Sequence, residues 1–109
     1  MRKILASLMI FPLVVVLAVP VVSAFECPKH FKEAKAAIDD AAAAMKKLPK
    51  EKHGLVHTLI DDAKMLLKSG KHNHKKPAAG GYDHARAIAK ADAARGYAVA
   101  AKLLAEKTK

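Results

Sequence analysis

Apolar residues return at alternating intervals of three and four between Phe31 and Leu48, and no other feature limits the fold of this chain as strongly. The stripe consists of Phe31, Ala34, Ile38, Ala41, Met45 and Leu48. This spacing places one narrow apolar face along an α-helix that packs against other helices. Pro28 is compatible with a first helical turn, whereas Pro49 cannot continue a helix, so we predict a helix over about residues 28–47.

A second apolar pattern follows Pro49 and forms a broader face. Its members are Leu55, Val56, Leu59, Ile60, Ala63, Leu66 and Leu67. Ser69 and Gly70 are typical of a helix C-terminus, which predicts a helix over about residues 50–69. Residues 70–81, GKHNHKKPAAGG, combine three glycines and a proline with cationic and imidazole side chains. Because they show no apolar periodicity, we predict that they form a long loop.

A third segment, over about residues 82–106, is rich in alanine and is therefore also predicted to be helical. Alanine can face either the core or solvent, so the sequence leaves open which face of this helix packs. Three helices with a short first connection predict an all-α fold, a small antiparallel three-helix bundle with up-down-up topology. The start of the first helix, the 70–81 loop and the start of the third helix then share one end, which we call the loop pole.

The N-terminal segment predicts export. Residues 1–3 (Met-Arg-Lys) are a short basic start, residues 4–22 are almost entirely apolar, and residues 22–24 (Val-Ser-Ala) suit a signal peptidase. We therefore predict a signal peptide over residues 1–24, cleavage after Ala24 and one helical-bundle domain over residues 25–109. The predicted location is periplasmic or secreted, and the alternative is an uncleaved membrane anchor.

The charge of the mature chain indicates one class of partner. Cleavage leaves 18 Lys and Arg against 10 Asp and Glu in 85 residues, a formal net charge of +8. Lys71, Lys75 and Lys76 lie in the predicted loop, where they could contact an acidic envelope component, a membrane surface or an acidic protein. Nucleic acid is not expected for an exported chain without an aromatic stacking platform. The sequence shows no nucleophile paired with a base, no phosphate-binding loop and no pair of catalytic carboxylates. An enzyme is therefore not expected.

Five potential metal ligands fall at the loop pole. They are Cys27, His30, His72, His74 and His84. Imidazole suits copper, zinc and nickel, and a thiolate favours Cu(I) or zinc. The helix start is expected to favour the thiolate form of Cys27. The sequence therefore predicts a metal site at this pole, and the alternative is a solvated basic loop whose histidines bind no metal.

A second, weaker metal candidate lies toward the opposite end of the bundle. His53, His57 and Asp61 are spaced four apart, so they fall on one face of the second predicted helix. Two imidazoles leave most coordination positions to water or a partner, and the alternative is a polar flank beside the core.

Cys27 is the only cysteine of a chain that we predict to be exported. A single thiol cannot form an internal disulfide. The thiol is therefore expected to bind a ligand, to remain reduced, or to join two chains in a disulfide-linked dimer.

Three stretches give the chain a resemblance to a known family. HGLVHTLIDDAKMLLKSG, GGYDHARAIAKADAARG and YAVAAKLLAEK, within a tryptophan-free chain rich in Ala, His and Lys, resemble the small periplasmic metal-binding proteins of the SmbP type over about residues 53–107. The resemblance implies a helical bundle that binds divalent ions, copper prominently, through regularly spaced histidines. Only His53, His57 and His84 can be matched to that pattern. The rest of the third predicted helix departs from it, since no histidine follows His84. We expect a non-enzymatic metal binder or buffer with one or two sites.

Overall fold

The computed structural model describes residues 26–108, which form three α-helices and one short 3-10 helix. The elements are α2 (Cys27–Lys46), η1 (Lys50–Lys52), α3 (Gly54–Lys75) and α4 (Gly81–Thr108). The predicted signal peptide and its cleavage site lie outside the described residues. Within residues 26–108, no helix combines the length and apolar character needed to cross a membrane.

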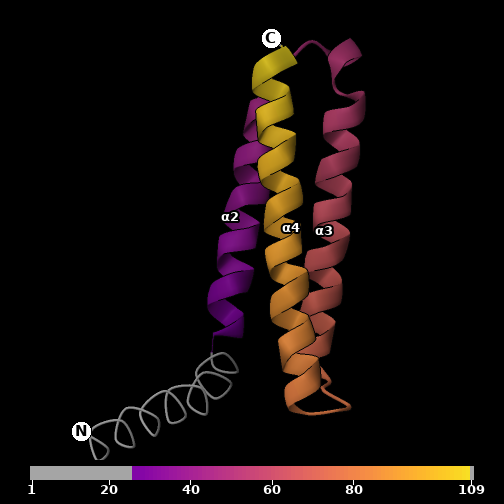
Figure 1. Ribbon diagram of the computed structural model, residues 1–109. Coiled ribbons are helices and arrows are strands. Elements are labelled where there is room, and N and C mark those ends of the chain that lie inside the picture. The colour runs from indigo at the N-terminus through magenta and orange to yellow at the C-terminus, as the bar shows by residue number, and fades with distance from the viewer. Residues whose placement is uncertain (1–25, 109) are drawn as a thin grey trace, which may run out of the picture.

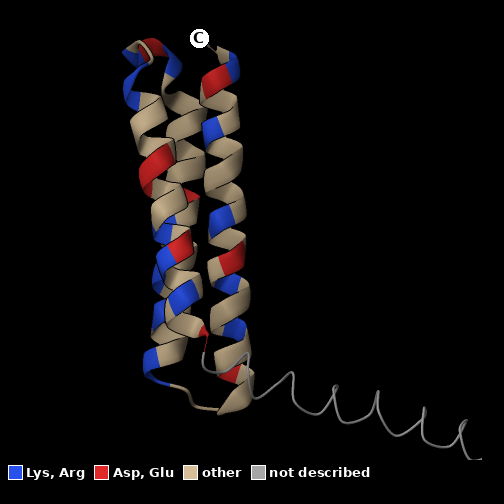
Figure 2. Cartoon of the chain, turned by 90° about the vertical axis from the view of Figure 1, so that its left-hand side faces the viewer, with Lys and Arg blue, Asp and Glu red and all other residues tan. Residues whose placement is uncertain are grey.

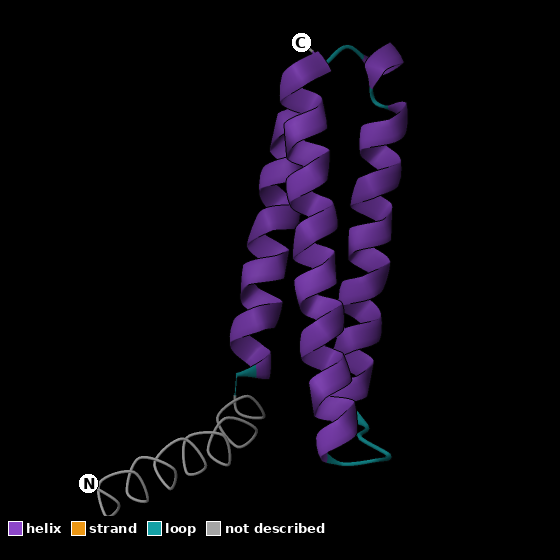
Figure 3. Cartoon of the chain, in the orientation of Figure 1, coloured by secondary structure: helices purple, strands orange, loops and turns teal. Residues whose placement is uncertain are grey.

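The helices form a bundle in which α4 contacts both of the others. In Figure 1 the chain ascends through α2, descends through α3 and ascends again through α4. The contacts between α2 and α3 are the least extensive of the three pairs. Figure 3 shows that short connections join the helices at both ends of the bundle and that the described chain contains no strand. The predicted all-α three-helix bundle is therefore confirmed.

The core follows the stripe that the sequence predicts for the first helix. Five of its six members are buried, and Met45 packs partly buried against them. α3 adds a second buried row that consists of Val56, Ile60, Ala63, Leu67 and Gly70. The two rows meet the face of α4 that the sequence left undetermined.

That face of α4 consists of alanines. The fully buried residues of the helix are Ala87, Ala91, Ala94, Ala98, Ala101 and Ala105. Ile88 and Leu104 border the core, while Val99 and Leu103 are exposed. Small side chains let neighbouring helices approach closely, so α4 lies between α2 and α3 without contributing a large residue to the core.

The prediction of a loop over residues 70–81 is wrong in its first half. α3 continues through Gly70 to Lys75, so the connection to α4 is only residues 76–80. A Cβ atom on Gly70 would lie 3.0 Å from the carbonyl oxygen of Ala87 and 3.2 Å from the Cβ of Lys90. Gly70 therefore allows close contact between α3 and α4 rather than ending α3. The left-handed backbone of the turn occurs at Gly80, whose φ is 56°.

Polar contacts cross the alanine-lined interface from both sides. The Lys90 ammonium donates hydrogen bonds of 2.7 Å to the Ser69 hydroxyl and 2.7 Å to the Asn73 side-chain oxygen, which joins α4 to α3. Arg95 lies 3.4 Å from the Glu33 carboxylate, which joins α4 to α2. Each pair fixes the position of one helix along its neighbour.

Candidate metal centre

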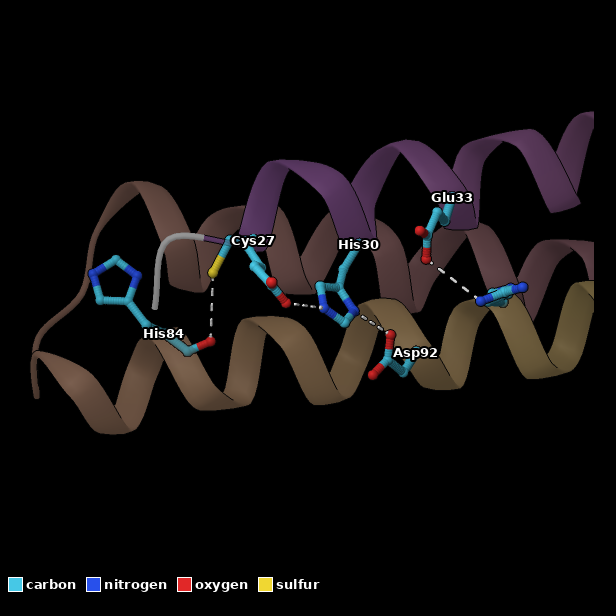
Figure 4. A network of polar contacts seen from close by, with 7 residues as sticks. Cys27, His30, Glu33, His84 and Asp92 are labelled. Atoms are coloured by element: carbon cyan, nitrogen blue, oxygen red, sulfur yellow. Dashed lines mark hydrogen bonds and ion pairs between the residues drawn. The ribbon is translucent and has the colours of Figure 1, made fainter. Parts of the chain in front are cut away.

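Cys27, His74 and His84 converge at the loop pole. One ligand atom from each residue, the Cys27 sulfur and a ring nitrogen of each histidine, lies within 4.8 Å of the other two. Cys27 is the first residue of α2, His74 lies in the last turn of α3, and His84 lies in the first turn of α4. Three helices therefore meet where these residues are placed, and Figure 4 shows the Cys27 sulfur directed toward the carbonyl oxygen of His84 on α4.

The Cys27 thiol is enclosed by protein. Its side chain is fully buried, and its Sγ lies 3.7 Å from the carbonyl oxygen of His84, to which the thiol donates a weak hydrogen bond. Burial raises the pKa of the thiol above its ordinary value, and this exceeds the opposing effect of a backbone hydrogen bond. The raised pKa therefore opposes the thiolate form that was expected at the helix start. A metal ion would have to displace the thiol proton.

The two histidines of the cluster hold buried nitrogen atoms without partners. The Nδ1 atoms of His74 and His84 are enclosed, and neither has a hydrogen-bond partner within residues 26–108. Leaving such an atom unsatisfied costs about 1–3 kcal/mol. The rings pack edge to face 5.4 Å apart, and Phe31 covers His74 at 5.5 Å. Coordination to a cation would give these nitrogens the partner that the protein lacks.

The spacing of the three donors fits a transition metal after a small contraction. Bonds of about 2.0–2.3 Å from nitrogen or sulfur to zinc place neighbouring donors about 3.3–3.8 Å apart in a tetrahedral or trigonal site. The present limit of 4.8 Å therefore calls for a contraction of about 1.5 Å at most. Because His74 and His84 are only half-buried, rotation of their rings can supply that movement.

His30 lies at the same pole but has different partners. Its Nδ1 donates a hydrogen bond of 2.6 Å to the Asp92 carboxylate, and its Nε2 lies 3.7 Å from the Glu26 carboxylate (Figure 4). The hydrogen bond to Asp92 is the main cause that raises the pKa of His30. The ring therefore links α2 to α4 and is not part of the Cys27–His74–His84 cluster. No pattern in the sequence indicated Asp92 as its partner.

His72 is directed away from the cluster, although only one residue separates it from His74. Two residues on an α-helix differ by about 200° in direction, so side chains at positions 72 and 74 leave α3 on nearly opposite sides. His72 is exposed and lines a groove between α2 and α3. A flexible loop would have allowed both rings to bind one ion, but the helix separates them.

The second candidate group, His53, His57 and Asp61, does not form one cluster. Its residues make two separate contacts. The Nε2 of His53 donates a hydrogen bond of 2.8 Å to the carbonyl oxygen of Leu48 at the turn before α3. The Nδ1 of His57 lies 3.1 Å from the Asp61 carboxylate, as the spacing of four allows, and both side chains are exposed. Among the described residues, these three do not form a metal-ligand cluster.

The chain shows no significant match to models of known protein families, to characterised proteins or to solved structures. The resemblance to SmbP-type proteins therefore rests on the sequence features alone.

Proposed function

We propose that this protein is an exported, non-enzymatic metal binder that holds one transition-metal ion with Cys27, His74 and His84. The observation that supports the proposal is the placement of three donors from three helices within 4.8 Å of one another. The buried, unpartnered nitrogens of both histidines support it independently. Its role would be to bind or buffer copper, zinc or nickel in the periplasm.

The donor set favours some metals over others. One thiolate and two imidazoles are ligands for Cu(I) and for zinc, while nickel accepts imidazole but gains less from a single soft sulfur. Three protein donors leave a position open to water or to another ligand, as in zinc sites that exchange their fourth ligand. An exchangeable fourth ligand would suit a protein that must both take up and release an ion.

The proposal is tested on protein recovered from a bacterial periplasm after expression of the full chain. Mass spectrometry first establishes whether cleavage follows Ala24. Calorimetric titration with Zn(II), Ni(II) and Cu(II), together with chelator competition for Cu(I), then measures affinity and stoichiometry. We expect one saturable site per chain.

The ligand assignment is tested with five single variants. Binding should fall at least tenfold in Cys27→Ser, His74→Ala and His84→Ala. His72→Ala and His57→Ala are matched controls. Each removes an exposed imidazole from α3, the helix that carries His74, without changing the cluster, so both variants should bind metal as the wild type does. Unchanged affinity in all three ligand variants, or no saturable binding of any metal, would exclude the proposed site.

A further inference from the structure

A basic groove runs between α2 and α3, the pair of helices with the least extensive contact. Its volume is about 490 Å³, and five lysines line it: Lys35, Lys64, Lys68, Lys71 and Lys75. Ile38 and Leu67 form its floor but are only 4% and 7% exposed, so these two side chains offer little surface to a ligand. Figure 2 shows basic residues along the side of the bundle that α2 and α3 form.

Most of the lysines in the groove form no ion pair with another described residue. Lys35 forms an ion pair of 2.9 Å with Asp39, which also lines the groove. The four lysines of α3 make no ion pair within the part of the chain that the structure describes. Like charges that face a common groove repel one another, and an anionic partner would relieve that repulsion.

The four lysines of α3 form a row with helical spacing. Positions 64, 68, 71 and 75 are separated by four, three and four residues, so their side chains leave one face of α3. At 1.5 Å per residue, the row is about 16 Å long. A second helix laid alongside has the same rise, so its carboxylates at the same spacing would meet all four ammonium groups in register.

We propose that this groove binds an acidic helix of a partner protein, one that carries Asp or Glu at intervals of four, three and four. Such a helix would occupy the position of a fourth helix in a bundle, between two helices that run in opposite directions. Charge pairs beside helix contacts determine partner choice in coiled coils in the same way. The lysine stems would cover the partner's backbone while their charged ends reach its carboxylates.

The groove extends and relocates the basic surface that the sequence predicts. Lys71 and Lys75 line it, whereas Lys76 lies beyond the end of α3. Lys35, Lys64 and Lys68 join it only because α2 and α3 fold side by side. None of these residues belongs to the metal cluster, so this proposal and the metal proposal can fail separately.

The probe is a fluorescein-labelled, alanine-based helical peptide of 18 residues with Glu at four positions spaced four, three and four. A peptide of identical composition, with its four Glu residues distributed around the helix, is the first control. Fluorescence anisotropy in metal-depleted buffer measures both affinities at 50 and 300 mM salt. We expect the striped peptide to bind at least tenfold more tightly than the scattered one at the lower salt, and more weakly at the higher salt.

Two variants, each with four Lys→Gln substitutions and therefore the same net charge, test whether the groove is the surface that binds the peptide. The groove variant carries K64Q, K68Q, K71Q and K75Q, and the control carries K29Q, K32Q, K46Q and K50Q, at exposed positions that do not line the groove. Circular dichroism checks that both remain helical. Loss of at least tenfold in affinity in the groove variant, with little change in the control, supports the proposal.

Three results would overturn the proposal. Equal binding of the two peptides would mean that the spacing of the lysines does not matter, and equal losses in the two variants would show attraction by net charge alone. Tighter binding of polyphosphate or of anionic phospholipid vesicles than of the striped peptide would identify a different class of partner.

Discussion

The two ends of the bundle both carry histidines, but the hydrogen bonding of these residues differs. At the loop pole, His74 and His84 each hold a buried nitrogen that has no partner among residues 26–108, beside the Cys27 thiol. At the opposite end, His53 donates to the carbonyl oxygen of Leu48, and His57 pairs with Asp61. The first pair is available to a ligand, whereas the second already stabilises the turn and the helix that hold it.

The contrast separates histidines whose nitrogens already have partners from histidines that could accept a ligand. His30 supports this conclusion from within the loop pole, because its ring is occupied by Asp92 and Glu26 and it takes no part in the cluster. Four predictions test how far the two ends differ.

The largest expected effect is that of metal on stability. Zinc at 100 times its dissociation constant should stabilise the protein by about 2.7 kcal/mol if it binds only the folded state. In a chain of this size, that corresponds to a rise in Tm on the order of 10–20 °C. Differential scanning calorimetry of wild type, His84→Ala and His57→Ala, each with and without zinc, measures the effect. A rise of equal size in His84→Ala would remove the distinction between the two ends.

The next effect concerns the contact that brings α3 to α4 near the loop pole. Gly70→Leu should lower the free energy of unfolding by about 1–3 kcal/mol, because the new side chain would collide with Ala87 and Lys90. It should also weaken zinc binding, since His74 lies one turn further along α3. Urea denaturation followed by circular dichroism measures the change in stability.

Gly96→Leu is the matched control for Gly70→Leu. A Cβ at Gly96 meets nothing within 4 Å, so this substitution should stabilise α4 by up to about 1 kcal/mol through helix propensity. Equal losses of stability in the two variants would contradict a specific close approach at Gly70.

His53→Ala should produce a smaller loss at the opposite end. Removal of its hydrogen bond to Leu48 is expected to cost about 0.5–1.5 kcal/mol. The increase in Tm caused by zinc should be unchanged, which calorimetry can show on the same samples. A reduced response to zinc would assign His53 a part in metal binding that its position does not indicate.

The smallest effect is the dependence of the His30–Asp92 contact on pH. The pKa of His30 is raised, so the contact stabilises the fold fully below the ordinary value of 6.5, and this contribution is lost as pH rises through the higher pKa of the folded state. Asp92→Asn should therefore cost more at pH 5.5 than at pH 9, by less than about 1 kcal/mol because Asp92 is half-exposed. Glu26 and Glu33 also raise this pKa, so Asp92→Asn should reduce the pH dependence without abolishing it. Thermal melts at both pH values would contradict this assignment if the cost were independent of pH.

The sequence was sufficient to predict all three helices. In the first two, the spacing of apolar residues also indicates which face is buried. It failed at Gly70, where the chemistry that commonly ends a helix instead allows two helices to touch. It also left the face of α4 open, because the buried residues of that helix are alanines and their burial depends on what packs against them.

All three residues of the candidate site were among the five that the sequence placed at the loop pole. Selecting them required two facts that sequence does not supply. The helical phase of α3 separates His74 from His72, and Asp92, which lies 62 residues away, occupies His30. The separation of His72 from His74 follows from their spacing, but only once the continuation of α3 beyond Gly70 is known.

The alanine face of α4 has a consequence for how the bundle keeps its alignment. Alanine has no side-chain rotamers, so this face is smooth and repetitive and opposes sliding of the helices only weakly. A slip of one turn would move a helix by about 5.4 Å and separate the three donors. Lys90, Arg95 and His30 prevent that slip because each holds a partner on another helix. These three residues hold the register of the bundle, and so they preserve the geometry of the candidate site, to which they contribute no atom.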